Sequence, residues 1–264
     1  SYVILSVSSN IWREHLMLRL EHVSMSVNNS NGDNKEILHD IDIDFTAGKL
    51  YAITGPNGGG KTSLAKVIMG IYGHSAGRIF LHDEDISQST VTERARLGIA
   101  YAFQHPPRFK GLTVGDLLKI AHTDVDILGL RKSLRDVGLC PEDYLDRDMG
   151  PGLSGGEMKR IEVAQVLARQ AAVSIFDEPE AGVDLWTIQR LIGIIVNRFK
   201  DNPNCTAIII THNENVLPLC DEIIVLEEGR IRDRGTPQEI WPLIRDDIEC
   251  KRRLECRGEM GYEI

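Results

Sequence analysis

The sequence predicts an α/β fold: a mostly parallel core sheet, an N-terminal antiparallel β subdomain and an inserted α-helical subdomain. Two continuous apolar runs, residues 172–176 and 206–210, are typical of parallel strands that are covered on both faces. A third short apolar strand, residues 50–54, leads into a glycine-rich loop and then into a helical stretch. A strand, a loop and a helix in this order, combined with further buried strands, indicate an α/β core.

The first hundred residues mainly predict strands. Apolar side chains alternate over residues 18–27, and the alternation resumes over residues 37–45 after a turn-forming polar stretch. These two segments predict a small antiparallel sheet that precedes the glycine-rich loop. Residues 78–82 and 98–103 predict further strands, and the segment between them is expected to consist of polar connections.

Residues 107–160 predict a helical subdomain inserted in the core. Thr113 and Asp116 have the spacing of a capping box, which opens a helix running through His122. Residues 126–137 repeat apolar side chains at helical spacing, and Pro141 suits a first helical turn. Because these segments lie between core strands, the helices form an insertion.

The last part of the chain returns to the core. Residues 222–233 predict a hairpin that turns at Glu228-Gly229, and residues 236–239 form a capping box with proline at the first helical position. We expect residues 17–250 to form a single domain. Residues 1–16 are then an N-terminal extension or an expression remnant, and residues 251–264 a C-terminal tail.

The composition and charge of the chain narrow the possible partners and the cellular location. The chain has 264 residues, 42% of them apolar, which is enough for a large core. The net charge is −9 and the pI about 5.4, which disfavours nucleic acid as a partner. Five scattered cysteines favour a reducing, cytoplasmic location over a disulfide framework. No apolar run approaches the roughly 20 residues that a membrane span needs.

The glycine-rich loop matches a phosphate-binding pattern. A glycine is followed, after four residues, by Gly60, Lys61 and Thr62. Glycines let backbone N–H groups form a nest for phosphate oxygens, Lys61 can reach the outer phosphates, and the Thr62 hydroxyl can ligate Mg²⁺. The alternative is a glycine turn that binds nothing, but the strand and helix on either side favour nucleoside triphosphate binding. The residues expected to bind it are Gly55, Pro56, Asn57, Gly58, Gly59, Gly60, Lys61, Thr62 and Ser63.

Two further motifs carry chemistry. Asp177 and Glu178 follow a buried strand, so Asp177 could hold Mg²⁺ and Glu178 could polarise the attacking water. Residues 153–157, Leu-Ser-Gly-Gly-Glu, place a hydroxyl and backbone N–H groups at a helix N-terminus, which suits a γ-phosphate. In isolation these motifs would be a surface acidic pair and a serine-capped helix. After a phosphate-binding loop, the functional interpretation is favoured.

The order of the motifs resembles the ABC-type ATPase family over essentially residues 17–244. The resemblance implies ATP and Mg²⁺ as ligands and two copies of the chain paired head to tail. Each ATP would lie between one copy's phosphate-binding loop and the other copy's Ser154, Gly155, Gly156 and Glu157. It also implies roles for three residues: Gln104 touches Mg²⁺ and the attacking water, Asp184 crosses the dimer interface, and His212 contacts the γ-phosphate.

Departures from the common family pattern resemble the SufC-type ATPase of iron–sulfur cluster assembly. They include Val27 where an adenine-stacking aromatic is usual, the Ala-Phe-Gln-x-Pro segment around Gln104, and Glu157 followed by Met-Lys-Arg-Ile-Glu. The resemblance implies soluble SufB- or SufD-like scaffold partners. The alternative is the ATPase subunit of a membrane transporter, with a permease as partner. A DNA-maintenance ATPase is disfavoured because no long coiled-coil insertion is present.

Three features stay open in the sequence. The helical subdomain residues Phe109 and Leu112 are a hypothesis for the partner-docking surface, because they lie near Gln104. Trp186 could pack at a dimer interface or cover its own helix. Cys250 and Cys256 are expected to be ordinary thiols, because their spacing does not suit one helix face and no histidine completes a metal site.

Overall fold

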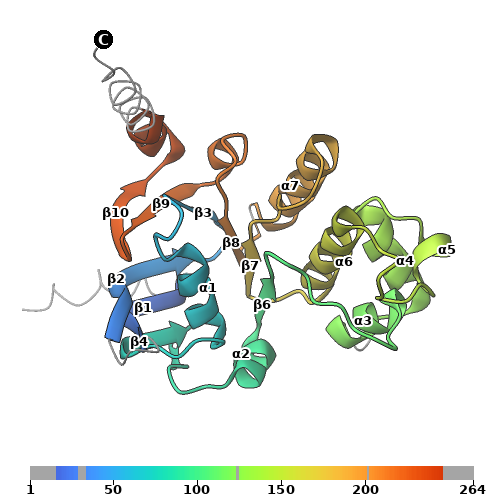
Figure 1. The fold of residues 1–264 in the computed structure, drawn as a ribbon, viewed down its shortest axis with the longest axis horizontal. Helices are drawn as coiled ribbons and strands as arrows, with labels where there is room; N and C mark the ends of the chain where they lie inside the picture. The colour runs from blue at the N-terminus through green and yellow to red at the C-terminus, as the bar shows by residue number, and fades with distance from the viewer. Residues whose placement is uncertain (1–15, 29–33, 123–124, 201, 246–264) are drawn as a thin grey trace, which may run out of the picture.

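The structure is a computed structural model and describes residues 16–28, 34–122, 125–200 and 202–245. Within them the strands form an antiparallel four-stranded sheet, in the order β2-β1-β4-β5, and a six-stranded sheet, in the order β10-β9-β3-β8-β7-β6 (Figure 1). The strands are β1 (Leu16–Asn28), β2 (Asn34–Thr46), β3 (Leu50–Thr54), β4 (Ala76–Leu81), β5 (Glu84–Asp85), β6 (Ile99–Ala102), β7 (Val173–Asp177), β8 (Thr206–Ile210), β9 (Glu222–Glu227) and β10 (Arg230–Gly235). The helices are α1 (Lys61–Met69), α2 (Val91–Leu97), α3 (Val114–Ala121), α4 (Ile127–Asp136), α5 (Pro141–Tyr144), α6 (Gly155–Ala168) and α7 (Leu185–Phe199), with a 3₁₀ turn η1 (Leu217–Leu219).

The six-stranded sheet is parallel from β9 to β6, and only β10 runs antiparallel to its neighbour. Every residue of β3, β7 and β8 is buried, which confirms the strands predicted from continuous apolar runs. The hairpin between β9 and β10 turns at Glu228 and Gly229, with φ of 48° and 73°. The predicted fold class is therefore confirmed. The parallel strands bring their carboxyl ends to one edge, where the sequence motifs lie.

The sheet divides the hydrophobic core into two clusters. Leu50 and Ala52 of β3 face the cluster that includes α6, α7 and the helical lobe, whereas Tyr51 and Ile53 face the cluster that includes α1 and the antiparallel sheet. Side chains of a strand alternate between its two faces, so each central strand contributes to both clusters. We name these the lobe cluster and the phosphate-loop cluster. The helices after the two anion-binding motifs therefore pack in different layers.

The helical lobe consists of α3, α4 and α5, and it packs on α6. Thr113 accepts a hydrogen bond from the Asp116 N–H and the Asp116 carboxylate accepts one from the Thr113 N–H, which confirms the predicted capping box. Residues 126–137 form α4 with Asp126 as its N-cap, as predicted. The predicted subdomain boundary at residue 160 falls inside α6. Since α6 packs against both β6 and the lobe helices, it belongs to the lobe and to the core.

The expectation of polar connections between residues 82 and 98 is wrong, because this segment contains β5 and α2. A complete capping box of Thr90 and Glu93 opens α2, a local signal that the polar composition concealed. Arg94 is 2% exposed and donates to four backbone carbonyls, two of them at the end of α1. The helix is thus held by a buried cation rather than by the apolar stripe that helix prediction relies on.

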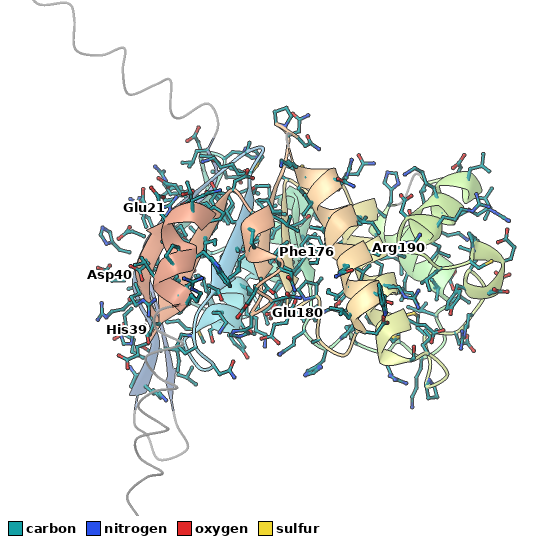
Figure 2. The ribbon with its side chains drawn as sticks, turned by 90° about the horizontal axis from the view of Figure 1, so that it is seen from above. Glu21, His39, Asp40, Phe176, Glu180 and Arg190 are labelled. Atoms are coloured by element: carbon teal, nitrogen blue, oxygen red, sulfur yellow. The ribbon has the colours of Figure 1, made fainter. Side chains whose placement is uncertain are left out.

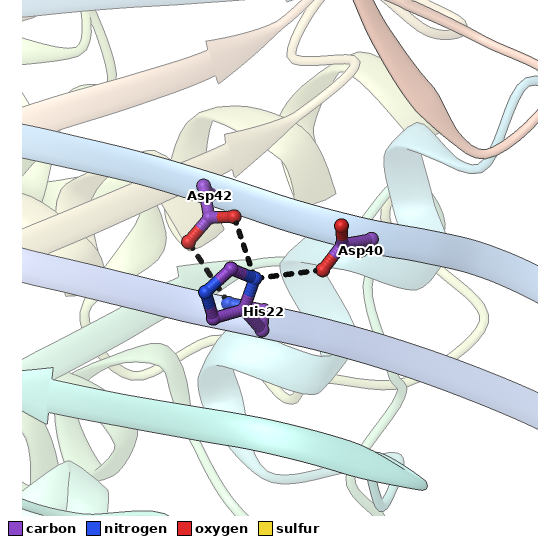
Figure 3. A group of neighbouring side chains, drawn as sticks. All are labelled: His22, Asp40 and Asp42. Atoms are coloured by element: carbon purple, nitrogen blue, oxygen red, sulfur yellow. Dashed lines mark hydrogen bonds and ion pairs between the residues drawn. The ribbon is translucent and has the colours of Figure 1, made fainter.

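The alternation in β1 shifts by one residue between Leu20 and Val23, where the strand has a bulge. His22 at this bulge and Asp40 on β2 both have left-handed φ, of 51° and 54°. The His22 Nδ1 lies 2.9 Å from Asp40 Oδ1 and 3.0 Å from Asp42 Oδ2 (Figure 3). The bond to Asp40 and the charge of Asp42 raise the pKa of His22. This exposed ion-paired group joins the two irregular strands.

Further expectations concern membrane spans, the termini and the helix that begins after Thr236. No helix among the described residues is long and apolar enough to cross a membrane. The termini, including Cys250 and Cys256, lie outside the described residues. The capping group of Thr236 and Glu239 is present: the Glu239 carboxylate accepts from the Thr236 N–H at 2.8 Å, at the start of a helical segment, residues 237–245.

Candidate functional site

The phosphate-loop pattern forms a tight turn between β3 and α1. A Cβ at Gly55 would lie 2.1 Å from the Leu226 carbonyl oxygen of β9, so no other residue fits there. Gly60 precedes α1 with φ of 100°, and no side chain of the described residues caps this helix. The N–H groups of the first helical turn therefore have no capping acceptor and are available to an anion, which the positive end of the helix dipole also favours.

Lys61 begins α1 and is 6% exposed. Its Nζ donates to the carbonyl oxygens of Gly55 at 2.9 Å and Pro56 at 2.8 Å. Burial lowers the pKa of Lys61, and the charges of Glu178 and Asp177 oppose that shift. The loop's own backbone thus holds the ammonium group near the two carboxylates at the end of β7.

Asp177 ends β7 and is 1% exposed. The Thr62 hydroxyl donates to its Oδ1 at 3.1 Å, and the Tyr101 hydroxyl donates to its Oδ2 at 2.6 Å. Burial and the bond to Asp177 both raise the pKa of Tyr101, so its proton stays on the phenol. The Thr62 hydroxyl and the Asp177 carboxylate form a set of oxygen ligands that suits Mg²⁺. Sequence reasoning found these two but missed Tyr101, whose contact joins positions 76 residues apart.

The structure brings together the three residues predicted to act in catalysis. Gln104 Nε2 donates to Glu178 Oε2 at 2.5 Å, and His212 Nε2 lies 3.8 Å from Glu178 Oε1. Glu178 has φ of 45°, and its backbone N–H donates to Ile210 of β8. This left-handed conformation turns the chain sharply after β7 and is anchored by the neighbouring strand. A single carboxylate is therefore flanked by an amide and an imidazole.

Glu180 is a further site residue that the sequence did not indicate. Its Oε1 accepts from the Thr211 hydroxyl at 2.5 Å and from the His212 N–H at 3.3 Å. Figure 2 places Glu180 near Phe176, in the middle of the molecule where β7 ends. Burial, followed by the charge of Lys61, lowers the pKa of His212, while Glu178 and Glu180 oppose the shift. The lowered pKa favours the neutral imidazole, in which one ring nitrogen donates a hydrogen bond and the other accepts one.

The second motif that the sequence predicts to bind an anion forms the start of α6. Ser154 and Glu157 form a capping box: the Ser154 hydroxyl oxygen accepts from the Glu157 N–H, and the Glu157 carboxylate accepts from the Ser154 N–H. The Glu157 carboxylate also accepts from the Tyr144 hydroxyl and from Arg147. These bonds, the one from Tyr144 foremost, lower the pKa of Glu157 to about 2. The motif's glutamate is therefore charged and neutralised from within the lobe.

The two anion-binding motifs are separated within one chain. Helix α1 packs in the phosphate-loop cluster and α6 in the lobe cluster, on the two sides of the central sheet (Figure 1). Asp184 caps α7 by accepting from the Thr187 N–H at 3.0 Å. The loop before it lies beside the start of α6, because a Cβ at Gly155 would be 3.8 Å from the Gly182 carbonyl oxygen. Trp186 does not cover its own helix, since it is 81% exposed.

Residues 38–181 match the family described as ABC transporter. The chain is 36% identical over 231 residues to an uncharacterized ABC transporter ATP-binding protein, MJ0035, of Methanocaldococcus jannaschii; the match covers 84% of this chain and 92% of that protein. It is 32% identical over 211 residues to the lipopolysaccharide export system ATP-binding protein LptB of Escherichia coli K12, covering 78% of this chain and 87% of LptB.

Solved structures agree on the fold. The dimeric structure of a post-hydrolysis state of the ATP-binding cassette MJ0796, bound to ADP and Pi, superimposes with a TM-score of 0.74 at 20% identity and covers 84% of this chain and 99% of that one. The structure of cbiO1 from Clostridium perfringens, part of the ABC transporter complex cbiONQ, superimposes with a TM-score of 0.69 at 28% identity and covers 93% and 98%.

Proposed function

The chain belongs to the ABC transporter family and carries its ATPase domain, and from that premise we propose that it is the ATP-hydrolysing subunit of a transporter whose permease is a separate membrane protein. The named relatives LptB and the sulfate/thiosulfate import protein CysA of Mesorhizobium japonicum, which is 32% identical over 214 residues, support this transporter assignment over the SufC-type expectation. We place the subunit on the cytoplasmic side of the membrane.

The observation that carries the proposal is an apolar groove between β6 and the helical lobe. We name it the lobe groove. Phe109 and Ile120, which line it, are 39% and 62% exposed, whereas most large apolar side chains of the domain are buried. The groove also includes Phe103, the residue before Gln104. An exposed apolar surface of this kind marks a partner interface. We propose that a short amphipathic cytoplasmic helix of the permease occupies it.

The site residues are proposed to act in ATP hydrolysis as follows. The loop N–H groups and Lys61 bind the phosphates, and Glu178 accepts a proton from the attacking water. Mg²⁺, when held by Thr62 and Asp177, supplies charge neutralisation for the phosphates. Gln104 orients Glu178 through its 2.5 Å hydrogen bond, and the neutral His212 imidazole contacts the transferred phosphate.

The proposal requires a second copy of the chain. Ser154 and the loop before Asp184 share one surface, and this surface lies on the other side of the sheet from α1. A head-to-tail pair would bring the α6 N-terminus of one copy to the phosphate loop of the other. The MJ0796 neighbour is dimeric with ADP and Pi bound, which supports the pairing of two copies.

Iron–sulfur cluster assembly is the second candidate function. Glu157, followed by the Lys-Arg sequence and Glu162, departs from the signature of most transport ATPases, and the structure gives these residues specific partners. In that case the lobe groove would receive a soluble SufB- or SufD-like scaffold rather than a permease.

Affinity purification with single groove substitutions tests the proposal. Ile120→Asp should abolish recovery of the partner, because it places a charge in the apolar groove. Leu128→Asp is the matched control, since Leu128 is 70% exposed on α4 and does not line the groove. A multi-span membrane protein in the recovered complex supports the transporter subunit, and soluble scaffold proteins support the second candidate. Equal recovery with both variants contradicts the groove assignment.

A further inference from the structure

Two charged residues of α6 are buried where the helix passes the core sheet. Lys159 is 0% exposed and Glu162 is 6% exposed, and Lys159 Nζ lies 3.2 Å from Glu162 Oε2. Removing two charges from water costs several kcal/mol per ion, and apolar residues of similar size often stabilise such a position equally well or better. Fold stability alone therefore does not account for this pair.

The pair holds the backbone of Phe103. Glu162 Oε1 accepts a hydrogen bond from the Phe103 N–H at 2.6 Å, and Lys159 Nζ donates to the Phe103 carbonyl oxygen. Both polar groups of this one peptide residue are thus bound by side chains that lie one helical turn apart. Phe103 directly follows β6 and directly precedes Gln104, so the pair fixes the point at which the Gln104 loop leaves the sheet.

Lys159 also reaches the neighbouring strand. Its Nζ lies 3.4 Å from the Asp177 carbonyl oxygen at the end of β7. The next residue is Glu178, whose carboxylate accepts the hydrogen bond from Gln104. The two residues that meet in this hydrogen bond are therefore each one peptide unit away from an atom that Lys159 holds.

Helix α6 connects this point to the second anion-binding motif. Lys159 lies five positions after Ser154, which is about 7.5 Å along a helix. A continuous helix is stiff, so a displacement of its N-terminus is carried to Lys159 and Glu162. We propose that the buried Lys159–Glu162 pair positions the Gln104 loop. Through this pair, a shift of the Ser154 motif changes the position of Gln104 relative to Glu178. The inference deepens the ATPase function proposed above and rests on it.

The ionisable groups around Lys159 and Glu162 are consistent with a positioning role for the pair. Burial raises the pKa of Glu162, and the Lys159 charge and the Phe103 N–H oppose the shift. Asp177 on β7 acts in the raising direction, and Tyr101 on β6 has its own pKa raised in part by Glu162. Lys159 thus pairs with the Glu162 carboxylate, while it meets Asp177 only through that residue's backbone carbonyl oxygen.

A pair of double substitutions separates positioning from stability. Lys159→Met with Glu162→Leu removes the hold on both polar groups of Phe103 while leaving no unpaired buried charge. Lys159→Met with Glu162→Gln keeps an acceptor for the Phe103 N–H and loses only the Lys159 bonds. Arg94→Met is the matched control, because Arg94 is an equally buried cation that binds only backbone carbonyls outside the site.

We expect the Met/Leu variant to lose about ten- to a hundredfold in kcat, since small misplacements of catalytic groups cost this much. Its ATP dissociation constant should change by less than about threefold, which is under 1 kcal/mol. Amide hydrogen exchange in a peptide containing Phe103 and Gln104 should accelerate, because the Phe103 N–H loses its acceptor. The Met/Gln variant should have a kcat between those of the wild type and the Met/Leu variant, and its Phe103 N–H should exchange more slowly than in the Met/Leu variant. If the Met/Leu variant does not fold, the Met/Gln variant alone provides the test.

Three results would overturn the inference: unchanged kcat in folded double variants, unchanged exchange at Phe103, or an equal loss of kcat in Arg94→Met. The wild-type chain and Glu178→Gln are measured in parallel. If Glu178→Gln still hydrolyses ATP at a near-normal rate, the proposed catalytic function fails. If Glu178→Gln is inactive and the double variants are normal, only the coupling role of the pair fails.

Discussion

Tyr101→Phe removes one oxygen from the site and tests whether Asp177 depends on its hydroxyl donors. Asp177 is 1% exposed and receives side-chain hydrogen bonds from Tyr101 and from Thr62. Phenylalanine keeps the ring, so packing against Phe103 is preserved, with the ring centroids 4.7 Å apart in the wild type. The substitution therefore isolates one hydrogen bond to a buried carboxylate.

The expected loss in the free energy of unfolding follows from the burial of Asp177. A hydrogen bond to a charged group contributes about 1.5–3 kcal/mol, and no water replaces it at a carboxylate this buried, so we expect a loss near the middle of that range. In a chain of this size each kcal/mol corresponds to roughly 2–4 °C, so the melting temperature should fall by about 5–9 °C. The Mg²⁺ concentration that supports half-maximal hydrolysis should also rise, because Asp177 loses its fixed orientation.

Differential scanning calorimetry and a phosphate-release assay with varied Mg²⁺ measure the two effects. Tyr72→Phe is the matched control, since Tyr72 is 39% exposed and, within the described part of the chain, its hydroxyl meets only Lys66, at 3.4 Å. If both variants melt at the same temperature and need the same Mg²⁺ concentration, the Tyr101 hydroxyl contributes nothing to Asp177 and the reasoning is refuted.

Three further predictions concern the proposed catalytic residues. Glu178→Gln should retain ATP binding and lower turnover by about 10²-fold or more, and size-exclusion chromatography with ATP should show an accumulated dimer; normal phosphate release would contradict the base assignment. Lys61→Ala should weaken ATP binding by about tenfold or more in titration calorimetry, because a charge-assisted contact to phosphate is lost; unchanged affinity would exclude Lys61 from the phosphate site. His212 has a lowered pKa, so it binds its proton less readily folded than unfolded. Activity should therefore stay level from pH 8 through the range in which an ordinary histidine titrates, and decline only at lower pH as His212 protonates. His212→Gln should remove this pH dependence; a decline that persists in His212→Gln belongs to another group.

Local sequence signals predicted much of the fold and the ends of the core strands. The buried strands, the glycine loop and the capping box at Thr113 depend on residues a few positions apart, so they can be read from spacing. Helix α2 carried the same kind of signal at Thr90 and Glu93 but was missed, because its segment is polar and its stabilising residue is the buried Arg94.

The remaining features depend on contacts between distant positions. Tyr101 meets Asp177, and Glu162 meets Phe103, across 76 and 59 positions. No local pattern distinguishes a tyrosine that packs in a core from one that donates to a carboxylate. The bulge at His22 was also missed. Its extra residue shifts the alternation of apolar side chains by one position, and the apolar residues on either side still read as one continuous strand.

The two-sided core has a practical consequence for spectroscopy. Ile208 and Ile210 of β8 belong to the phosphate-loop cluster, whereas Ile209 between them belongs to the lobe cluster. On β9, Ile223 and Ile224 divide in the same way. Methyl labelling of isoleucine alone would place NMR reporters in both layers at adjacent sequence positions. Nucleotide binding and partner docking could then be followed separately in one sample, by the resonances that each perturbs.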